Sequence, residues 1–159
     1  MYQPLKILHL EDLPADAEMV DRVLRKAQFR FEKQLVLDKS DFIKALKEFI
    51  PDVILSDHSL PAFNSMEALR VTREMGIHAP FILVTATVSE EYAVNMIKEG
   101  ASDYILKDRL ERLPNAVQNA LDKQLMEIES RLADDALRAS EQKYKLLFEC
   151  NPMPMWMVS

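Results

Sequence analysis

The sequence predicts an α/β protein, a (βα)5 doubly wound parallel sheet with a long C-terminal helical extension. Five short apolar runs, rich in β-branched residues, alternate with longer segments of helical periodicity. Alternation of this kind is typical of a parallel sheet whose strands are joined by helices on both faces. Charged and hydroxyl residues follow these runs, at the edge of the sheet where binding sites of such folds lie.

The predicted strands are the runs at 5–10, 31–37, 53–56, 81–85 and 104–106. Helical patterns lie between them at 14–28, 40–49, 65–75 and 89–98. Pro14 suits the first turn of a helix, where its missing N–H has no partner to lose. Gly76 and Gly100 follow predicted helix ends, where a left-handed residue is favoured. Three of the four predicted helices therefore have a start or stop signal consistent with their pattern.

The chain changes character after the last predicted strand. Between about 110 and 148 it has no glycine and a high density of charge. Apolar residues recur there at alternating steps of four and three, at Leu121, Leu125, Ile128 and Leu132. This spacing indicates a coiled coil, which we favour over a single amphipathic helix folded back on the domain. We therefore interpret 123–148 as a helical linker and expect a homodimer that pairs through the linker and the receiver face.

Composition narrows the classes of function. The net charge of −6 and the absence of a basic run argue against a nucleic-acid partner. No apolar stretch approaches the ~20 residues of a membrane span, and the N-terminus lacks a signal peptide, so we expect a cytoplasmic protein. Two glycines are too few for a glycine-rich nucleotide loop, and the single Cys150 excludes an internal disulfide.

The residues that end the predicted strands form a chemically coherent set: Glu11, Asp12, Asp57, Thr85 and Lys107. Three carboxylates in one crevice repel one another unless a cation is present. Oxygen ligands favour Mg²⁺, with Mn²⁺ as a substitute. Asp57 can attack phosphorus and become an acyl phosphate, while Lys107 and Thr85 stabilise the phosphoryl oxygens. The set predicts magnesium-dependent phosphoryl acceptance on Asp57.

These motifs resemble the receiver domain of response regulators, the CheY-like family. The matching segments are ILHLED, VILSDHSLP, FILVTA and GASDYILK, and the resemblance covers 4–122. It implies a flavodoxin-like fold with strand order 2-1-3-4-5. It also implies two-component phosphorelay signalling, in which a histidine kinase or a histidine phosphotransfer protein donates the phosphoryl group.

The resemblance further implies roles for individual residues. Magnesium would be held by Asp12, Asp57 and the backbone carbonyl of Ser59, with Glu11 acting partly through water. Thr85 and Tyr104 would then switch conformation and remodel the receiver face.

Two departures from the family pattern predict altered loops. Asp108 stands where a proline usually follows the lysine, and Ser65 stands where many receivers have glycine.

A second resemblance begins in the linker. The segment ALRASEQKYKLLFECNPMPMWMVS resembles the opening of a PAS domain, so we expect 149–159 to be the start of a truncated PAS domain. This layout is similar to that of some hybrid sensory histidine kinases, in which case the parent protein could be a kinase.

Two alternative functions remain. A receiver can serve as a phosphate-independent dimerisation or docking module, although such receivers typically lose an acid or the lysine. A phosphatase with an aspartate nucleophile needs a second aspartate two residues later, and Ser59 occupies that position. We therefore expect no enzyme in this chain beyond the self-phosphorylation and dephosphorylation of a signalling domain.

Overall fold

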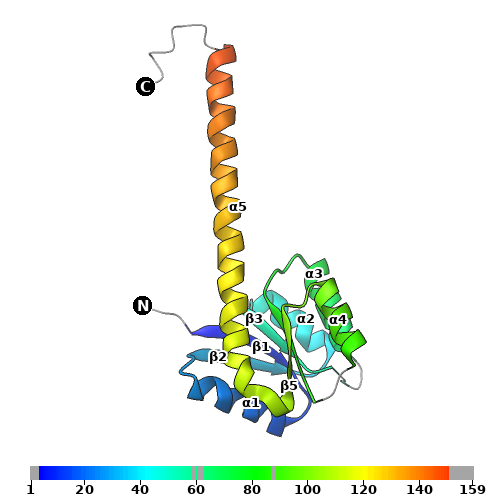
Figure 1. The fold of residues 1–159 in the computed structure, drawn as a ribbon. Helices are drawn as coiled ribbons and strands as arrows, with labels where there is room; N and C mark the ends of the chain where they lie inside the picture. The colour runs from blue at the N-terminus through cyan, green and yellow to red at the C-terminus, as the bar shows by residue number, and fades with distance from the viewer. Residues whose placement is uncertain (1–3, 59, 61–62, 87–88, 151–159) are drawn as a thin grey trace. The chain divides into compact units, whose positions relative to one another are not determined.

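The computed structural model describes residues 4–58, 60, 63–86 and 89–150, with side chains as far as residue 133. Its centre is a five-stranded parallel sheet in the order β2-β1-β3-β4-β5 (Figure 1). The predicted flavodoxin-like fold and strand order are therefore confirmed.

The observed strands lie within one residue of the predicted runs. They are β1 (Leu5–Leu10), β2 (Phe31–Val36), β3 (Val53–Ser56), β4 (Phe81–Thr85) and β5 (Asp103–Leu106). The connecting helices are α1 (Pro14–Lys26), α2 (Lys39–Glu48), α3 (Ser65–Glu74) and α4 (Glu90–Glu99). A 3-10 helix, η1 (Lys107–Arg112), follows β5 and leads into α5 (Leu113–Cys150). No pattern in the sequence predicts η1.

Side-chain caps fix where three helices begin. The side chains of Asp38, Asn64 and Ser89 each accept a hydrogen bond from a backbone N–H in the first turn of α2, α3 and α4. Such caps satisfy backbone donors that have no partner within the helix. At the other end, Gly76 and Gly100 have φ values of 76° and 116°. Both glycines therefore occupy the backbone region predicted for residues just past a helix end.

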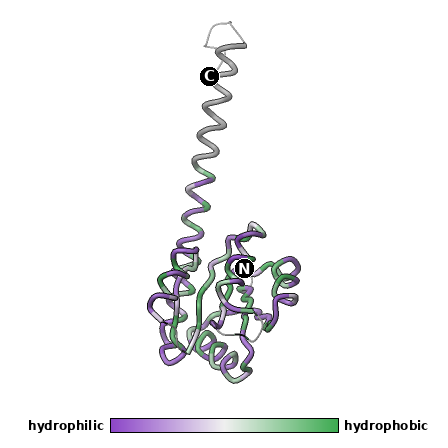
Figure 2. Tube along the Cα trace, turned by 90° about the vertical axis from the view of Figure 1, so that its right-hand side faces the viewer, coloured by the Kyte–Doolittle hydropathy of each residue, from purple (hydrophilic) through white to green (hydrophobic). Residues whose placement is uncertain are grey.

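The core has two apolar layers, one on each face of the sheet. One layer joins β1, β3 and β4 to α2, α3 and α4, with Phe42, Leu69 and Met96 among its buried side chains. The other joins the sheet to α1 and α5, where Leu24 and Val117 are fully buried. Figure 2 shows the result as hydrophobic strands between helices that alternate in hydropathy. Because helices cover both faces of the sheet, the carboxyl ends of the strands are the place left for a site.

The C-terminal part of α5 belongs to a separate unit. Compactness divides the chain into Met1–Asp122 and Lys123–Ser159. Leu121 packs against the core of the first unit, whereas Leu125, Ile128 and Leu132 are exposed in the single chain. The coiled coil and the homodimer stay predictions. The proposed PAS segment falls largely on residues 151–159, which lie outside the described residues.

Among the described residues, no helix has both the length and the apolar character that crossing a bilayer requires.

Candidate functional site

The candidate site lies at the carboxyl ends of β1 and β3, which are neighbours in the sheet. Leu10 pairs with Ser56 as the last residue of each strand. The N–H of Asp57 donates to the carbonyl of Leu10 at 2.9 Å, and the N–H of Glu11 donates to that of Val36 at 3.1 Å. Backbone pairing thus continues one residue past the strands and fixes both acids at the sheet edge.

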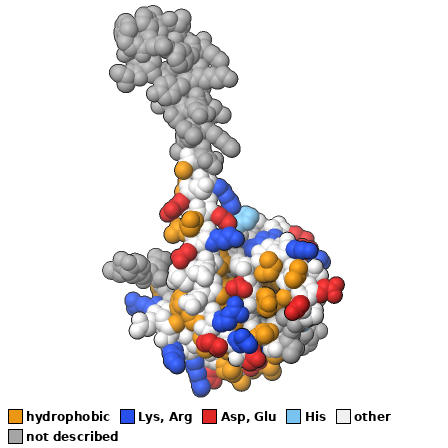
Figure 3. All heavy atoms as spheres, in the orientation of Figure 1, with side chains coloured by type: hydrophobic (Ala, Val, Ile, Leu, Met, Phe, Trp, Pro, Cys, Tyr) orange, Lys and Arg blue, Asp and Glu red, His pale blue; other side chains and the backbone are white. Residues whose placement is uncertain are grey.

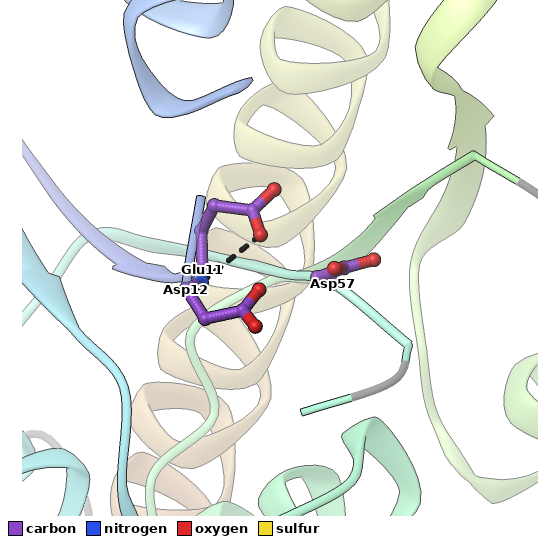
Figure 4. Close-up of side chains that lie close together, drawn as sticks. All are labelled: Glu11, Asp12 and Asp57. Atoms are coloured by element: carbon purple, nitrogen blue, oxygen red, sulfur yellow. Dashed lines mark hydrogen bonds between the residues drawn. The ribbon is translucent and has the colours of Figure 1, made fainter. Parts of the chain in front are cut away.

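Three carboxylates meet at this edge. Ligand oxygens of Glu11, Asp12 and Asp57 lie within 4.8 Å of one another. Figure 4 shows Glu11 and Asp12 side by side at the end of β1, with Asp57 across from them just after β3. An all-oxygen set of carboxylates matches the donors that Mg²⁺ prefers, and Mg²⁺ keeps waters in its remaining positions. The residues present therefore fit the predicted cation.

Backbone donors orient two of these carboxylates. The N–H of Asp12 donates to Oε2 of Glu11 at 3.0 Å, drawn as the dashed line in Figure 4. The N–H of His58 donates to Oδ1 of Asp57 at 2.8 Å. Each carboxylate thus has one oxygen held by the backbone and a second oxygen available to a cation or an ammonium group.

Lys107 supplies the positive charge of the site. Its Nζ lies 2.5 Å from Oε1 of Glu11, 2.7 Å from Oδ2 of Asp16 and 3.5 Å from Oδ2 of Asp57. Glu11, Asp57 and Lys107 were predicted to converge, and the structure brings them together. Asp16 was not predicted. Its position in the first turn of α1, four residues after Asp12, is the signal that could have identified it.

Burial changes the protonation of this cluster. Glu11 is 1% exposed. Burial raises the pKa of Glu11 to about 7; the hydrogen bond from Lys107 opposes this shift, and the charge of Asp57 adds to it. Burial tends to lower the pKa of Lys107, but hydrogen bonds to Asp16 and Glu11 and the surrounding negative charge raise it above the ordinary value. The lysine therefore stays charged at neutral pH, whereas the Glu11 carboxyl titrates there.

The two predicted switch residues lie in different environments. Thr85 ends β4 and is 3% exposed, and its backbone partner Leu106 directly precedes Lys107. Tyr104 in β5 is 38% exposed, so its ring is not turned into the core. Ser59, the predicted source of a carbonyl ligand, lies outside the described residues.

The structure shows the environments of Ser65 and Asp108, the two residues that depart from the family pattern. Ser65 is fully buried as the first residue of α3, where it needs no positive φ. Its hydroxyl lies 2.6 Å from the hydroxyl of Tyr92 in α4 and 3.4 Å from Nδ1 of His58. Asp108 is the second residue of η1, and the described residues contain no cis peptide bond.

One face of the described part of the chain carries charges of both signs. Figure 3 shows basic and acidic side chains interspersed with hydrophobic ones on one face of the described part of the chain. The net charge of −6 is therefore not gathered into a single acidic patch on that face.

Comparison with known proteins identifies relatives among bacterial regulators. The chain is 34% identical over 103 residues to the DNA-binding response regulator MtrA of Mycolicibacterium smegmatis, a match that covers 64% of this chain and 43% of MtrA. It is 39% identical over 93 residues to the regulatory protein AtoC of Escherichia coli, covering 58% of this chain and 20% of AtoC. The chain thus spans less than half of either relative. Because MtrA is described as DNA-binding, these relatives do not support the expectation of no nucleic-acid partner.

Solved structures agree on the fold. The signal receiver domain of a LuxO repressor protein from Vibrio parahaemolyticus superimposes with a TM-score of 0.72 at 24% identity, covering 80% of this chain and 98% of that one. A CheY-like receiver domain protein from Methanospirillum hungatei gives a TM-score of 0.69 at 22% identity, covering 79% and 99%.

The family match includes most of the residues that form the sheet. The profile described as the response regulator receiver domain matches residues 7–118, which is more than half of the chain. The predicted resemblance to receivers is confirmed, and this chain belongs to the response regulator receiver domain family.

Proposed function

We propose that Asp57 accepts a phosphoryl group from a phosphohistidine, in a magnesium-dependent step of two-component signalling. The observation that supports this most strongly is the convergence of Glu11, Asp12, Asp57 and Lys107 at one sheet edge. Carboxylates alone would suit many cation sites. A carboxylate with both a cation site and an ammonium group beside it suits phosphoryl transfer, which depends on positioning and charge stabilisation.

The step can be written with its atoms balanced. An Oδ atom of Asp57 attacks phosphorus and forms an oxygen–phosphorus bond. The phosphorus–nitrogen bond to the donor imidazole breaks, and its electron pair stays on that nitrogen. Because the second ring nitrogen of the phosphohistidine carries a proton in the reacting form, the products are an aspartyl phosphate and a neutral imidazole. Asp12, Asp57 and the Ser59 carbonyl would hold magnesium, with Glu11 acting partly through water, and the bound cation would neutralise phosphoryl charge.

The chain's own groups hold the remaining phosphoryl oxygens. Lys107 has its Nζ 3.5 Å from Asp57, so a small movement brings it to a phosphoryl oxygen. Thr85 ends the neighbouring strand and can donate its hydroxyl to another oxygen. Once Thr85 turns toward the phosphate, space behind it would allow Tyr104 to move inward from its exposed position. Phosphorylation would thereby favour a second conformation of the face formed by α4, β5 and α5.

The donor has to reach a nearly buried carboxylate. Asp57 is 8% exposed, so the partner must cover the sheet edge around it. A cavity of about 550 Å³ lies beside Lys107, between α1 and η1, with Met19, Val23 and Leu110 among its apolar lining residues. Met19 is 45% exposed. We infer that a histidine kinase or histidine phosphotransfer protein docks an apolar side chain here while its imidazole faces Asp57.

The domain is proposed as a signalling switch rather than an enzyme with a separate substrate. Its state would pass through α5 into the linker and toward a PAS domain, the module that residues 149–159 resemble. A phosphate-independent docking module is the second candidate. The intact acidic cluster and lysine favour the switch, because a pure docking module has no use for several costly buried charges.

Intact mass spectrometry tests the proposal. With acetyl phosphate and Mg²⁺, the protein should gain the mass of one phosphoryl group, and hydroxylamine should remove it. Asp57→Asn should abolish the gain, whereas Asp52→Asn, at an exposed acid away from the cluster, should keep it. A protein that gains no phosphoryl group under these conditions would support the docking module instead.

A further inference from the structure

Asp16 differs from the other two partners of Lys107. Glu11 and Asp57 belong to the acidic cluster that fits a cation, whereas Asp16 is outside that cluster. Its carboxylate nevertheless makes a 2.7 Å hydrogen bond with Nζ of Lys107, across 91 positions of the sequence. Asp16 is therefore the partner of Lys107 that a bound cation does not share.

A cation and an ammonium group compete for the same carboxylate oxygens. When magnesium draws on Glu11 and Asp57, their attraction for Lys107 weakens because the charge is shared. The pair with Asp16 is unaffected by this competition, so it becomes the principal anchor of the lysine. A phosphoryl group on Asp57 must then compete with the Asp16 carboxylate for the ammonium group of Lys107.

The position of Asp16 strengthens its electrostatic attraction for Lys107. The carboxylate lies in the first turn of α1, where the helix N-terminus stabilises negative charge. The side chains of Lys107 and Asp16 are only 12% and 26% exposed, so water screens the pair weakly. A charge-assisted hydrogen bond in such a place is stronger than an exposed surface pair.

We propose that Asp16 is a positioning residue that holds the ammonium of Lys107 in the unphosphorylated protein and competes with the phosphoryl group for it. This rests on the proposed function of Asp57 as acceptor. Asp16 thereby lowers the affinity of the site for a phosphoryl group, and it links the first turn of α1 to the start of η1 until phosphate arrives. The proposal assigns a role to a residue that the magnesium site does not use.

Binding of beryllofluoride, an analogue of the phosphoryl group, tests the competition. The affinity of the full chain for beryllofluoride at saturating Mg²⁺ can be measured by ¹⁹F NMR titration. Asp16→Asn should bind about three to ten times more tightly, as expected from losing one charge-assisted competitor. Asp16→Glu, which keeps a carboxylate, should return the affinity toward that of the unmodified protein. Asp16→Ser provides a second variant if the amide disturbs folding.

Glu18→Gln is the matched control, because it removes the same charge from the same helix. Glu18 pairs with Arg22 on the exposed surface, 2.9 Å away, rather than with Lys107. Its substitution should leave the affinity unchanged. An equal gain in Glu18→Gln would mean that net charge alone is responsible and would overturn the proposal.

The Lys107→Ala background separates competition for the lysine from a general effect of Asp16. In that background Asp16→Asn should no longer tighten binding, because the shared partner is gone. Unchanged or weaker binding in Asp16→Asn with Lys107 present would overturn the proposal. If the unmodified protein does not bind beryllofluoride at all, the acceptor function itself fails, which is a different result.

Discussion

At the scale of single residues, Glu11 is the carboxyl whose protonation the fold changes most clearly. Burial raises its pKa from an ordinary value of 4.5 to about 7, despite the nearby lysine. Between these two values the folded protein binds more protons at Glu11 than the unfolded chain does. The free energy of unfolding should therefore fall as the pH rises from about 4.5 to about 7, and the loss should be complete above that range.

This gives a prediction for the metal-free protein. In the presence of a chelator, the unmodified protein should lose up to about 3 kcal/mol more stability between pH 5 and pH 8 than Glu11→Gln does. Urea unfolding at both pH values measures the difference. Saturating Mg²⁺ should reduce the difference, because a cation favours the ionised carboxyl. Parallel pH dependence of the two proteins without metal would contradict a raised pKa at Glu11.

The backbone conformation of Ile50 leads to a second prediction. Ile50 has a φ of 52° and is 67% exposed. A β-branched residue is strained at positive φ, whereas glycine adopts it without a steric cost. Ile50→Gly should therefore raise the free energy of unfolding by about 0.5–1 kcal/mol, measured by urea denaturation. Val94→Gly is the comparison, because Val94 is also an exposed β-branched residue but lies inside α4; it should lose stability instead.

At the scale of elements, a partly buried contact joins α3 to α4 beside the acceptor. The hydroxyls of Ser65 and Tyr92 lie 2.6 Å apart, and the Tyr92 ring packs edge-on against His58 with centroids 4.1 Å apart. Because the N–H of His58 contacts Asp57, α4 is connected to the site through these three side chains.

The strength of this contact can be measured. Tyr92→Phe keeps the ring packing and removes one hydroxyl, so it should lower the free energy of unfolding by about 0.5–1.5 kcal/mol. In a Ser65→Ala background the same change should cost clearly less, because its partner is already missing. Tyr104→Phe is the control, since its side chain is exposed and should be nearly neutral. Additive losses in the double variant would show that the two hydroxyls do not interact.

The strands and helices show which parts of this fold and site can be predicted from the sequence. All five strands and the four helices between them could be located, because β-branched runs and capped amphipathic segments carry strong local signals. Glu11, Asp57 and Lys107 could be grouped because parallel strands bring their carboxyl ends to one edge. Neither η1 nor the pairing of Asp16 with Lys107 was predictable in this way. The first has no local pattern that separates it from α5, and the second depends on how α1 packs beside η1.

At the scale of the whole molecule, the segment after residue 122 bears on assembly. Leu125, Ile128 and Leu132 are exposed on α5 in the single chain, at the spacing of a coiled-coil seam. We predict a homodimer in which this stripe is buried between two copies. Sedimentation should show Leu125→Asp with Ile128→Asp to be monomeric, and a chain ending at Lys123 to dimerise far more weakly.

A matched pair of substitutions distinguishes the stripe from the rest of the helix. Met126→Asp with Ser130→Asp adds the same two charges at positions outside the seam, and it should leave the dimer intact. A full chain that sediments as a monomer at high concentration would defeat the coiled-coil interpretation.

The proposed function of the whole molecule requires Asp57 to carry the phosphoryl group, and the modified side chain can be identified directly. Borohydride reduces an aspartyl phosphate to homoserine, which marks the modified position permanently. After reaction with acetyl phosphate and Mg²⁺, followed by borohydride and proteolysis, peptide mass spectrometry should find homoserine at position 57 alone. Homoserine at Asp12 or Asp52, or none in a protein that had gained phosphate, would contradict the assignment of Asp57 as the acceptor.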